Sequence, residues 1–176
     1  MLETLTARLA ASNSLSDEQV QQAVEDLVDE KIPATVKADF LIGLAKKRET
    51  IEEISAFAAV LRDKAIQPPI DQAWRGSHEI LDVVGTGGDK AGTFNISTTV
   101  AIICSAAGVA VAKHGNRAVT SQVGSADVLE ALGIPVGLAP KEAARSLREY
   151  NFAFFFAPNY HPAFKNIAPA RKRGIK

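Results

Sequence analysis

The stretch ILDVVGTGGD at residues 80–89 decides the fold class, because it joins a short apolar run to a glycine-rich turn. The run 80–84 is typical of a buried β-strand. Further along the chain, helices are predicted over 97–107, 126–132 and 140–150, and strands over 109–112 and 152–156. Strands that alternate with helices of this length predict an α/β fold with a parallel sheet covered on both faces.

The first 66 residues predict a different architecture, a small bundle of short amphipathic helices. Capping-box patterns at Ser16–Gln19 and Thr50–Glu53 each precede apolar residues at helical spacing. Two prolines and a glycine then interrupt the pattern, so a linker is predicted over 67–79. The predicted domains are therefore a helical domain over 1–66 and an α/β domain over 80–176.

The composition excludes several classes of protein. The 176 residues include 20 Lys and Arg, 20 Asp and Glu and one Cys, and 47% are hydrophobic. This is apolar enough for a packed core, and a single Cys can form neither an internal disulfide nor a Cys-based zinc site. No apolar stretch approaches the length of a membrane span, and the N-terminus lacks a signal-peptide pattern. We expect a soluble cytoplasmic protein with no membrane partner.

The net charge of zero conceals an asymmetry between the two halves of the chain. Residues 1–75 carry 13 acidic and 9 basic residues, whereas residues 76–176 carry 7 acidic and 11 basic residues. A basic half is compatible with an anionic ligand and equally with an ordinary solvated surface.

The glycine-rich turn is the first candidate for a binding site. Gly85, Gly87 and Gly88 follow a predicted strand directly, and glycine allows a ligand to approach the bare backbone amides. Successive amides form a concavity that suits phosphate oxygens. A tight strand-to-helix turn without a ligand is the alternative. The loop matches neither the GxGxxG dinucleotide pattern nor the P-loop pattern.

Polar residues gather where the next predicted helix begins. The sequence TFNISTT at 93–99 holds four hydroxyl residues, and one N-cap requires only one of them. The others suit hydrogen bonds to phosphate or a contact with a hard cation such as Mg²⁺.

A third polar segment, KHGNR at 113–117, follows the second predicted strand. Ligands of parallel sheets bind beyond the carboxyl ends of the strands, where this segment lies. Lys113 and Arg117 supply charge there, and Gly115 and Gly124 allow close approach. A solvated polar loop is the alternative, and it is weakened by the presence of two such segments after successive strands.

These motifs, in this order, closely resemble the anthranilate phosphoribosyltransferase family of the tryptophan pathway. The resemblance rests on GTGGD, NIST, KHGNR, GSADVLEALGI and HPAFKNIAPAR. It implies a helical domain, commonly a homodimer interface, packed on an α/β domain of the nucleoside phosphorylase and phosphoribosyltransferase type. It also implies transfer of phosphoribosyl from 5-phosphoribosyl 1-pyrophosphate (PRPP) to the amine of anthranilate, with release of pyrophosphate and with Mg²⁺ as cofactor.

The resemblance also implies roles for individual residues. The PRPP-binding residues would be Gly85, Thr86, Gly87, Gly88, Asp89, Thr93, Asn95, Ser97, Thr98, Lys113, Gly115, Asn116, Arg117, Ser121 and Ser125, with Ser97 a magnesium ligand. The anthranilate-binding residues would be Gly85, Asn116, His161 and Arg171.

The expected chemistry requires electrostatic stabilisation more than a general base. Negative charge builds on the departing pyrophosphate, where Mg²⁺, Lys113 and backbone amides would stabilise it. A guanidinium such as that of Arg171 pairs with both oxygens of a carboxylate. We assign no catalytic residue: His114 and His161 are interpreted as orienting or structural, and Cys104 as a core residue.

The resemblance covers about the first half of a family chain. The adjacent Asp-Glu pair that binds magnesium in the family is absent after the ribose-phosphate motifs. We therefore expect the 176-residue chain alone to have little or no transferase activity.

Three other functions are compatible with the sequence. A pyrimidine-nucleoside phosphorylase shares the fold but has no carboxylate for Asn116 and Arg171 to bind. A non-catalytic relative that binds nucleic acid is disfavoured by the neutral charge and by the low aromatic content of 6%. An interaction module with a vestigial α/β domain is disfavoured by the retained motifs.

Overall fold

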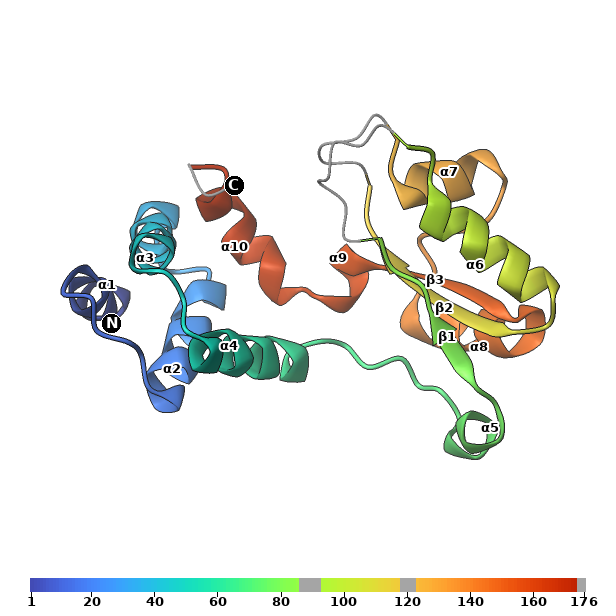
Figure 1. Ribbon diagram of the computed structural model, residues 1–176, viewed down its shortest axis with the longest axis horizontal. Helices are drawn as coiled ribbons and strands as arrows, with labels where there is room; N and C mark the ends of the chain where they lie inside the picture. Colours follow the sequence, from blue (N-terminus) through green and yellow to red (C-terminus); the bar gives the residue numbers. More distant parts are fainter. Residues whose placement is uncertain (86–92, 118–122, 174–176) are drawn as a thin grey trace. The chain divides into compact units, whose positions relative to one another are not determined.

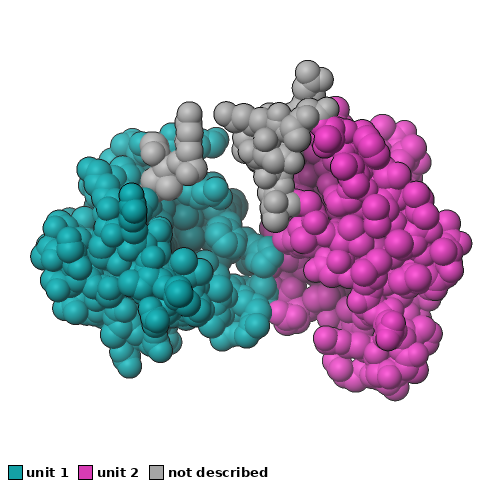
Figure 2. Space-filling model, in the orientation of Figure 1, with its two compact units in different colours: residues 1–65, 161–176 teal, residues 66–160 magenta. Residues whose placement is uncertain are grey.

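The computed structural model describes residues 1–85, 93–117 and 123–173, which form two compact units (Figures 1 and 2). One unit comprises Met1–Ala65 with His161–Lys176, and the other comprises Ile66–Tyr160. Each unit has its own core and is described separately. Among the helices of the described ranges, none has the length and hydrophobicity needed to cross a membrane.

The helical unit packs its helices around one apolar core. Its elements are α1 (Leu2–Ala10), α2 (Asp17–Val28), α3 (Ala34–Lys47), α4 (Ile51–Asp63) and α10 (Ala163–Arg171). Buried leucines at positions 2, 5 and 9 give α1 one apolar face, which packs against α3. Phe40, Leu44, Val20 and Leu27 complete the centre of the core.

Both predicted capping boxes are present. The Ser16 backbone N–H donates to Gln19 Oε1 at 3.0 Å, and the Gln19 N–H donates to Ser16 Oγ at 3.4 Å. At α4 the same exchange joins Thr50 and Glu53, at 2.8 and 3.2 Å. Each exchange satisfies two backbone donors that a helix start leaves without partners.

Helix α10 belongs to the helical unit although it follows the α/β segment in sequence. Ile167 is buried in the same core as Phe40, and Ala170 is fully buried. The sequence predicts residues 161–176 as part of the α/β domain, and that domain range stays a prediction; by packing, α10 lies with the helices of the first unit. The segment predicted as linker contains a short helix, α5 (Gln72–Ser77), whose N-cap is Asp71.

The α/β unit is built on a parallel sheet with strand order β1-β2-β3 within the described ranges. Its first element is α5. The elements that follow are β1 (Ile80–Asp82), α6 (Ile96–Ala106), β2 (Ala110–Gly115), α7 (Ser125–Ala131), α8 (Pro140–Tyr150), β3 (Phe152–Phe156) and α9 (Ala157–Tyr160). Ile80 pairs with Ala110, and Val111 pairs with Phe152. The predicted α/β fold class with an N-terminal helical bundle is confirmed.

The phenylalanine-rich strand β3 explains why helices cover both faces of the sheet (Figure 1). Successive side chains of a strand point to opposite faces. Phe154 packs with Ala126 and Leu129 of α7, and Ile102 of α6 packs against this cluster. Phe155 packs on the other face with Leu147 of α8, in a cluster with which α5 and α9 also pack.

Candidate functional site

The candidate site lies beyond the carboxyl ends of β1 and β2, where Lys113 joins three segments of the α/β unit. Lys113 Nζ donates to the carbonyl oxygen of Val83 at 3.1 Å and to Ser97 Oγ at 3.1 Å. One ammonium group therefore connects the end of β2 with the segment after β1 and with the first turn of α6. This is the edge at which parallel sheets bind their ligands.

The electrostatics of Lys113 favour an anion at this edge. The residue is fully buried, and its two hydrogen-bond acceptors in the part of the chain that the structure describes are neutral oxygens. Burial lowers the pKa of the Lys113 ammonium, and the nearby Asp82 carboxylate partly opposes this shift. The N-terminus of α6 adds the positive end of a helix dipole at the same place. A phosphate group would compensate both positive features.

The hydroxyl residues at the start of α6 do not cap the helix. The N-cap is Asn95, which makes no side-chain cap bond; its Nδ2 donates instead to the Val123 carbonyl at 3.2 Å. Thr98 is fully buried, and its Oγ1 has no hydrogen-bond partner among the described residues. Buried hydroxyls without partners are rare in proteins, so Thr98 is consistent with a polar ligand at this helix start.

Gly85 lies close to the Lys113 contact. A Cβ atom added at Gly85 would lie 3.1 Å from Ser97 Oγ and 3.6 Å from Ser97 Cβ. The absence of a side chain at Gly85 therefore leaves room for Ser97, and the contact of Gly85 with a ligand stays a prediction.

Gly115 has a packing role that the sequence did not reveal. A Cβ atom at this position would lie 2.9 Å from Cε2 of Phe154 and 3.5 Å from Cβ of Ser125. The glycine therefore allows β2, β3 and the start of α7 to pack together. The Ala126 N–H donates to the Asn116 carbonyl at 3.4 Å, which brings the predicted residues Asn116 and Ser125 into one region.

Arg117 faces two acidic residues of α7. Its guanidinium donates to both carboxylate oxygens of Glu130, each at 2.7 Å, and to Asp127 Oδ1 at 2.9 Å. These bonds raise the pKa of Arg117, with Glu130 contributing most, and the same contact lowers the pKa of Glu130. In this arrangement Arg117 attaches the loop after β2 to α7, and its contact with PRPP stays a prediction.

The remaining predicted residues fall into two groups. Thr86, Gly87, Gly88, Asp89 and Ser121 lie outside the described residues. His161 and Arg171 lie in the helical unit, at the two ends of the α10 segment. The His161 ring contacts that of Phe164 edge-on at 5.8 Å, and Arg171 is exposed. The other predicted residues lie nearer together: Lys113 and Gly85 lie beside Ser97, Thr98 and the N-cap Asn95 belong to the start of the same helix, and the exposed Thr93 precedes them in sequence.

Two parts of the site were missed by sequence reasoning. Asp82 ends β1, and its carboxylate raises the pKa of Lys113 against the effect of burial. The sequence feature that could have indicated this role is an acidic residue at the end of a predicted parallel strand. Arg117 forms ion pairs with Asp127 and Glu130. These two acidic residues lie three positions apart on a predicted helix, so they share one face of it, and this spacing could have indicated a common basic partner.

The residues present fit a magnesium ion only in part. Ser97 offers a hard hydroxyl oxygen of the kind that Mg²⁺ prefers, but Lys113 Nζ lies 3.1 Å from it. Among the described residues, no group of three or more His, Cys, Asp and Glu side chains could hold a metal ion. Ser97 stays the predicted magnesium ligand within the part of the chain that the structure describes.

Comparison with known families assigns both parts of the chain. The model of the glycosyl transferase family, helical bundle domain, matches residues 3–65, and that of the glycosyl transferase family, a/b domain, matches residues 77–174. The chain belongs to this family.

Its similar relatives within the glycosyl transferase family are anthranilate phosphoribosyltransferases, which confirms the predicted resemblance. The protein of that name from Petrotoga mobilis is 47% identical over 170 residues, covering 96% of this chain and 48% of its own length. The one from Desulfotalea psychrophila is 45% identical over 171 residues, covering 97% and 49%. The chain spans about half the length of the curated relatives it matches.

Solved structures of anthranilate phosphoribosyltransferases are also similar to this chain over about half of their own length. The anthranilate phosphoribosyltransferase of Thermus thermophilus matches with a TM-score of 0.82 at 36% identity, over 98% of this chain and 51% of that one. The enzyme from Saccharomyces cerevisiae, solved in complex with PRPP and Mg, matches with a TM-score of 0.82 at 26% identity, over 97% and 50%.

Proposed function

We propose that this chain provides the PRPP-binding half of an anthranilate phosphoribosyltransferase of tryptophan biosynthesis. The observation that carries the proposal is the buried Lys113 ammonium, whose hydrogen-bond acceptors among the described residues are both neutral and which lies beside the N-terminus of α6. The family and the similar relatives support the choice of PRPP among possible anionic ligands.

The proposed reaction displaces pyrophosphate from C1 of the ribose. The C1–O bond breaks and its electron pair leaves with pyrophosphate, while the lone pair of the anthranilate amine forms the new C1–N bond. The amine then loses a proton to solvent. Lys113 and the backbone amides near Gly85 stabilise the leaving charge, and Ser97 and Thr98 orient phosphate oxygens.

Magnesium is the proposed cofactor. When bound, it would neutralise part of the charge on the pyrophosphate, with Ser97 as its ligand from the described chain. The further PRPP contacts proposed for Asn95, Thr93, Asn116 and Ser125 position the substrate and need no charge of their own.

Anthranilate would be held through its carboxylate. Arg171 offers a guanidinium whose planar fork matches a carboxylate, and Asn116 offers an amide donor. We assign His161 an orienting role beside the acceptor, and Gly85 close backbone approach.

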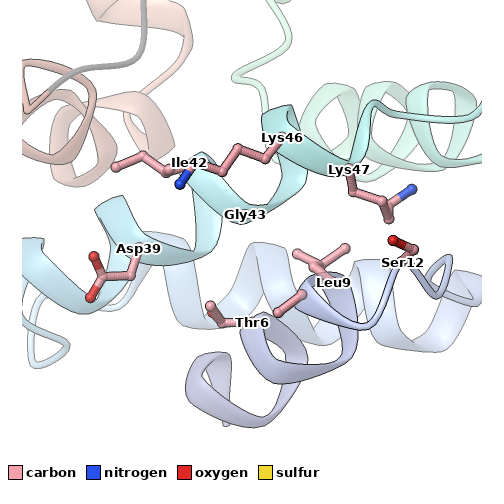
Figure 3. A pocket seen from close by; sticks show the side chains of 9 residues that line it. Thr6, Leu9, Ser12, Asp39, Ile42, Gly43, Lys46 and Lys47 are labelled. Carbon is pink, nitrogen blue, oxygen red and sulfur yellow. The ribbon is translucent and has the colours of Figure 1, made fainter.

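We also propose a cytoplasmic homodimer formed through the helical unit. A hollow of about 460 Å³ lies between α1 and α3, with Leu9 and Ile42 among its lining residues together with Asp39 and Lys46 (Figure 3). In a two-fold symmetric interface each patch meets its own copy, so opposite charges on one patch complement each other across the axis. We expect Ile42→Glu to convert a dimer to a monomer in light scattering. A monomeric wild-type chain would contradict this part.

The transferase assignment is tested with substrates of the two candidate reactions. PRPP, Mg²⁺ and anthranilate are added to the purified chain, and pyrophosphate release is measured beside PRPP binding. We expect the 176-residue chain to bind PRPP and to show little or no turnover. Phosphorolysis of uridine or thymidine without PRPP binding would contradict the assignment and favour a nucleoside phosphorylase.

A further inference from the structure

Lys37 is a buried cation in the helical unit that the proposed chemistry does not use. It lies on α3 and is 2% exposed, and its Nζ donates to the Asp29 carbonyl at 2.8 Å and to the Asn166 carbonyl at 3.2 Å. Burial lowers the pKa of Lys37, while Asp29 and Glu30 oppose the shift. Burying an ammonium group costs free energy unless it is hydrogen-bonded. The two carbonyl acceptors therefore hold Lys37 Nζ at this place in the core.

Asn166 makes a second connection at the same place. Its side-chain Nδ2 donates to the Val28 carbonyl at 2.9 Å. Val28 is the last residue of α2, and Asp29 is its C-cap. Lys37 and Asn166 thus both bind carbonyl oxygens at the C-terminus of α2, where the helix leaves acceptors without partners and carries the negative end of its dipole.

Helix α10 depends on these connections for its position. It has only nine residues and contains Pro169, which lacks a backbone donor. A helix this short is marginal by itself in water. Besides the hydrogen bonds at residue 166, α10 buries the side chains of Ile167 and Ala170 and contacts α2 and α3.

We propose that Lys37 and Asn166 are positioning residues that fix α10 on the helical bundle, and thereby fix the acceptor-binding residues His161 and Arg171. This inference rests on the proposed function, because the roles of His161 and Arg171 come from it.

The test combines hydrogen exchange with ligand binding. In Lys37→Met, the backbone amides of α10 should exchange at least about tenfold faster while those of α4 stay protected, because the bonds that are lost join Nζ to the Asn166 and Asp29 carbonyls and neither involves α4. The dissociation constant for anthranilate should rise by about tenfold or more, and that for PRPP with Mg²⁺ should stay within about twofold. Lys37→Arg keeps a cation and should restore part of the anthranilate affinity.

Two further variants keep the result interpretable. Arg62→Met removes an exposed basic side chain of α4, outside the hollow between α1 and α3, and should change neither measurement. Asn166→Asp removes the donor to Val28 and should release α10 in the same way. This variant replaces Lys37→Met in the test if Lys37→Met does not fold.

Each outcome decides the inference. Loss of protection throughout α1–α4 in both variants would show a general folding role and overturn it. Unchanged protection of α10, or unchanged anthranilate affinity with α10 released, would also overturn it. If the wild-type chain binds no anthranilate while α10 is selectively released, the acceptor part of the proposed function fails and the positioning of α10 stands.

Discussion

Lys113 Nζ lies 3.1 Å from Ser97 Oγ, and this contact joins the end of strand β2 to the first turn of helix α6. The two residues are 16 positions apart in sequence. Their contact places a buried positive charge, a helix N-terminus and a hydroxyl group together at the edge of a parallel sheet, which is an arrangement suited to phosphate.

The buried ammonium predicts opposite pH dependences for stability and for binding. Because burial lowers the pKa of Lys113, the folded chain loses this proton at lower pH than the unfolded chain. Between the lowered pKa and the ordinary lysine value of 10.5, the unfolded chain binds more protons, so the contribution of Lys113 to the free energy of unfolding rises with pH. Affinity for PRPP should fall over the same range, because a neutral amine attracts phosphate less.

Urea unfolding and PRPP titrations from about pH 8 upward measure both effects, since phosphate groups with a second pKa near 6 no longer titrate there. Lys113→Met should lose the rise in stability. A PRPP affinity that increases with pH would contradict the role of Lys113.

Gly85→Ala should weaken PRPP binding. The added Cβ would lie 3.1 Å from Ser97 Oγ, so Ser97 must shift and its bond with Lys113 must change. We expect a loss of about tenfold in affinity, or about 1.4 kcal/mol. Gly137→Ala is the matched control, because no atom of the described residues lies within 4 Å of its added Cβ. Equal effects of both substitutions in calorimetry would show that backbone entropy, and not the Ser97 contact, is responsible.

Glu53→Gln should strongly destabilise the helical unit. The Glu53 side chain is buried and accepts hydrogen bonds from Lys47 Nζ at 2.7 Å and from the Leu15 and Thr50 N–H groups at 2.9 and 2.8 Å. The substitution leaves the Lys47 charge without its partner, which typically costs about 3 kcal/mol or more. Chemical unfolding followed by helical circular dichroism measures this change, and the exposed neighbour substitution Glu52→Gln should change it little.

The same carboxylate predicts acid sensitivity. Burial alone would raise the pKa of Glu53, but the hydrogen bonds from Lys47, Thr50 and Leu15 outweigh burial and lower it. Its contribution to stability is therefore present above the ordinary pKa of 4.5 and is lost as the pH falls toward the lowered value. A helical unit equally stable at about pH 3 and pH 7 would contradict this interpretation.

Helix α6 exposes an apolar stripe that predicts self-association of the isolated chain. Ile96, Val100 and Ile103 recur at helical spacing and are 50%, 40% and 62% exposed. Contiguous apolar surface of this kind promotes association in water. Ile103→Lys should reduce binding of a hydrophobic dye and the apparent mass in light scattering. Leu132→Lys changes an exposed leucine outside the stripe and should have a smaller effect.

Local patterns predicted most of the fold. The helix at 140–150 and the strand at 152–156 have the predicted bounds, since a proline opens the helix and five apolar residues form the strand. Both capping boxes could also be predicted from the sequence, because their hydrogen bonds join residues three positions apart. Strand β1 is shorter than predicted and ends at Asp82.

Contacts between distant residues could not be predicted in this way. The bond between Lys37 and Asn166 spans 129 positions, and the apolar pattern of 163–171 does not indicate which core receives Ile167. Helix α5 was not predicted, because the prolines before it indicate a linker. Asp71 nevertheless accepts a hydrogen bond from the Trp74 N–H, as an N-cap residue does.

For the candidate site, the motifs predicted which segments lie near the sheet edge but not the partner of each side chain. Lys113 was predicted to bind phosphate, yet its full burial depends on packing between β2 and α6. Gly115 was interpreted as allowing ligand approach, and the ring of Phe154 against it depends on the register of β2 and β3.

The most direct test of the central claim is calorimetric titration of the 176-residue chain with PRPP in the presence of Mg²⁺, beside Lys113→Met and the exposed control Lys141→Met. The proposed site predicts stoichiometric binding by wild type and by Lys141→Met, and an affinity reduced by at least about tenfold in a folded Lys113→Met. Equal affinities of wild type and Lys113→Met, or no binding by wild type, would contradict the assignment of this sheet edge as the PRPP site.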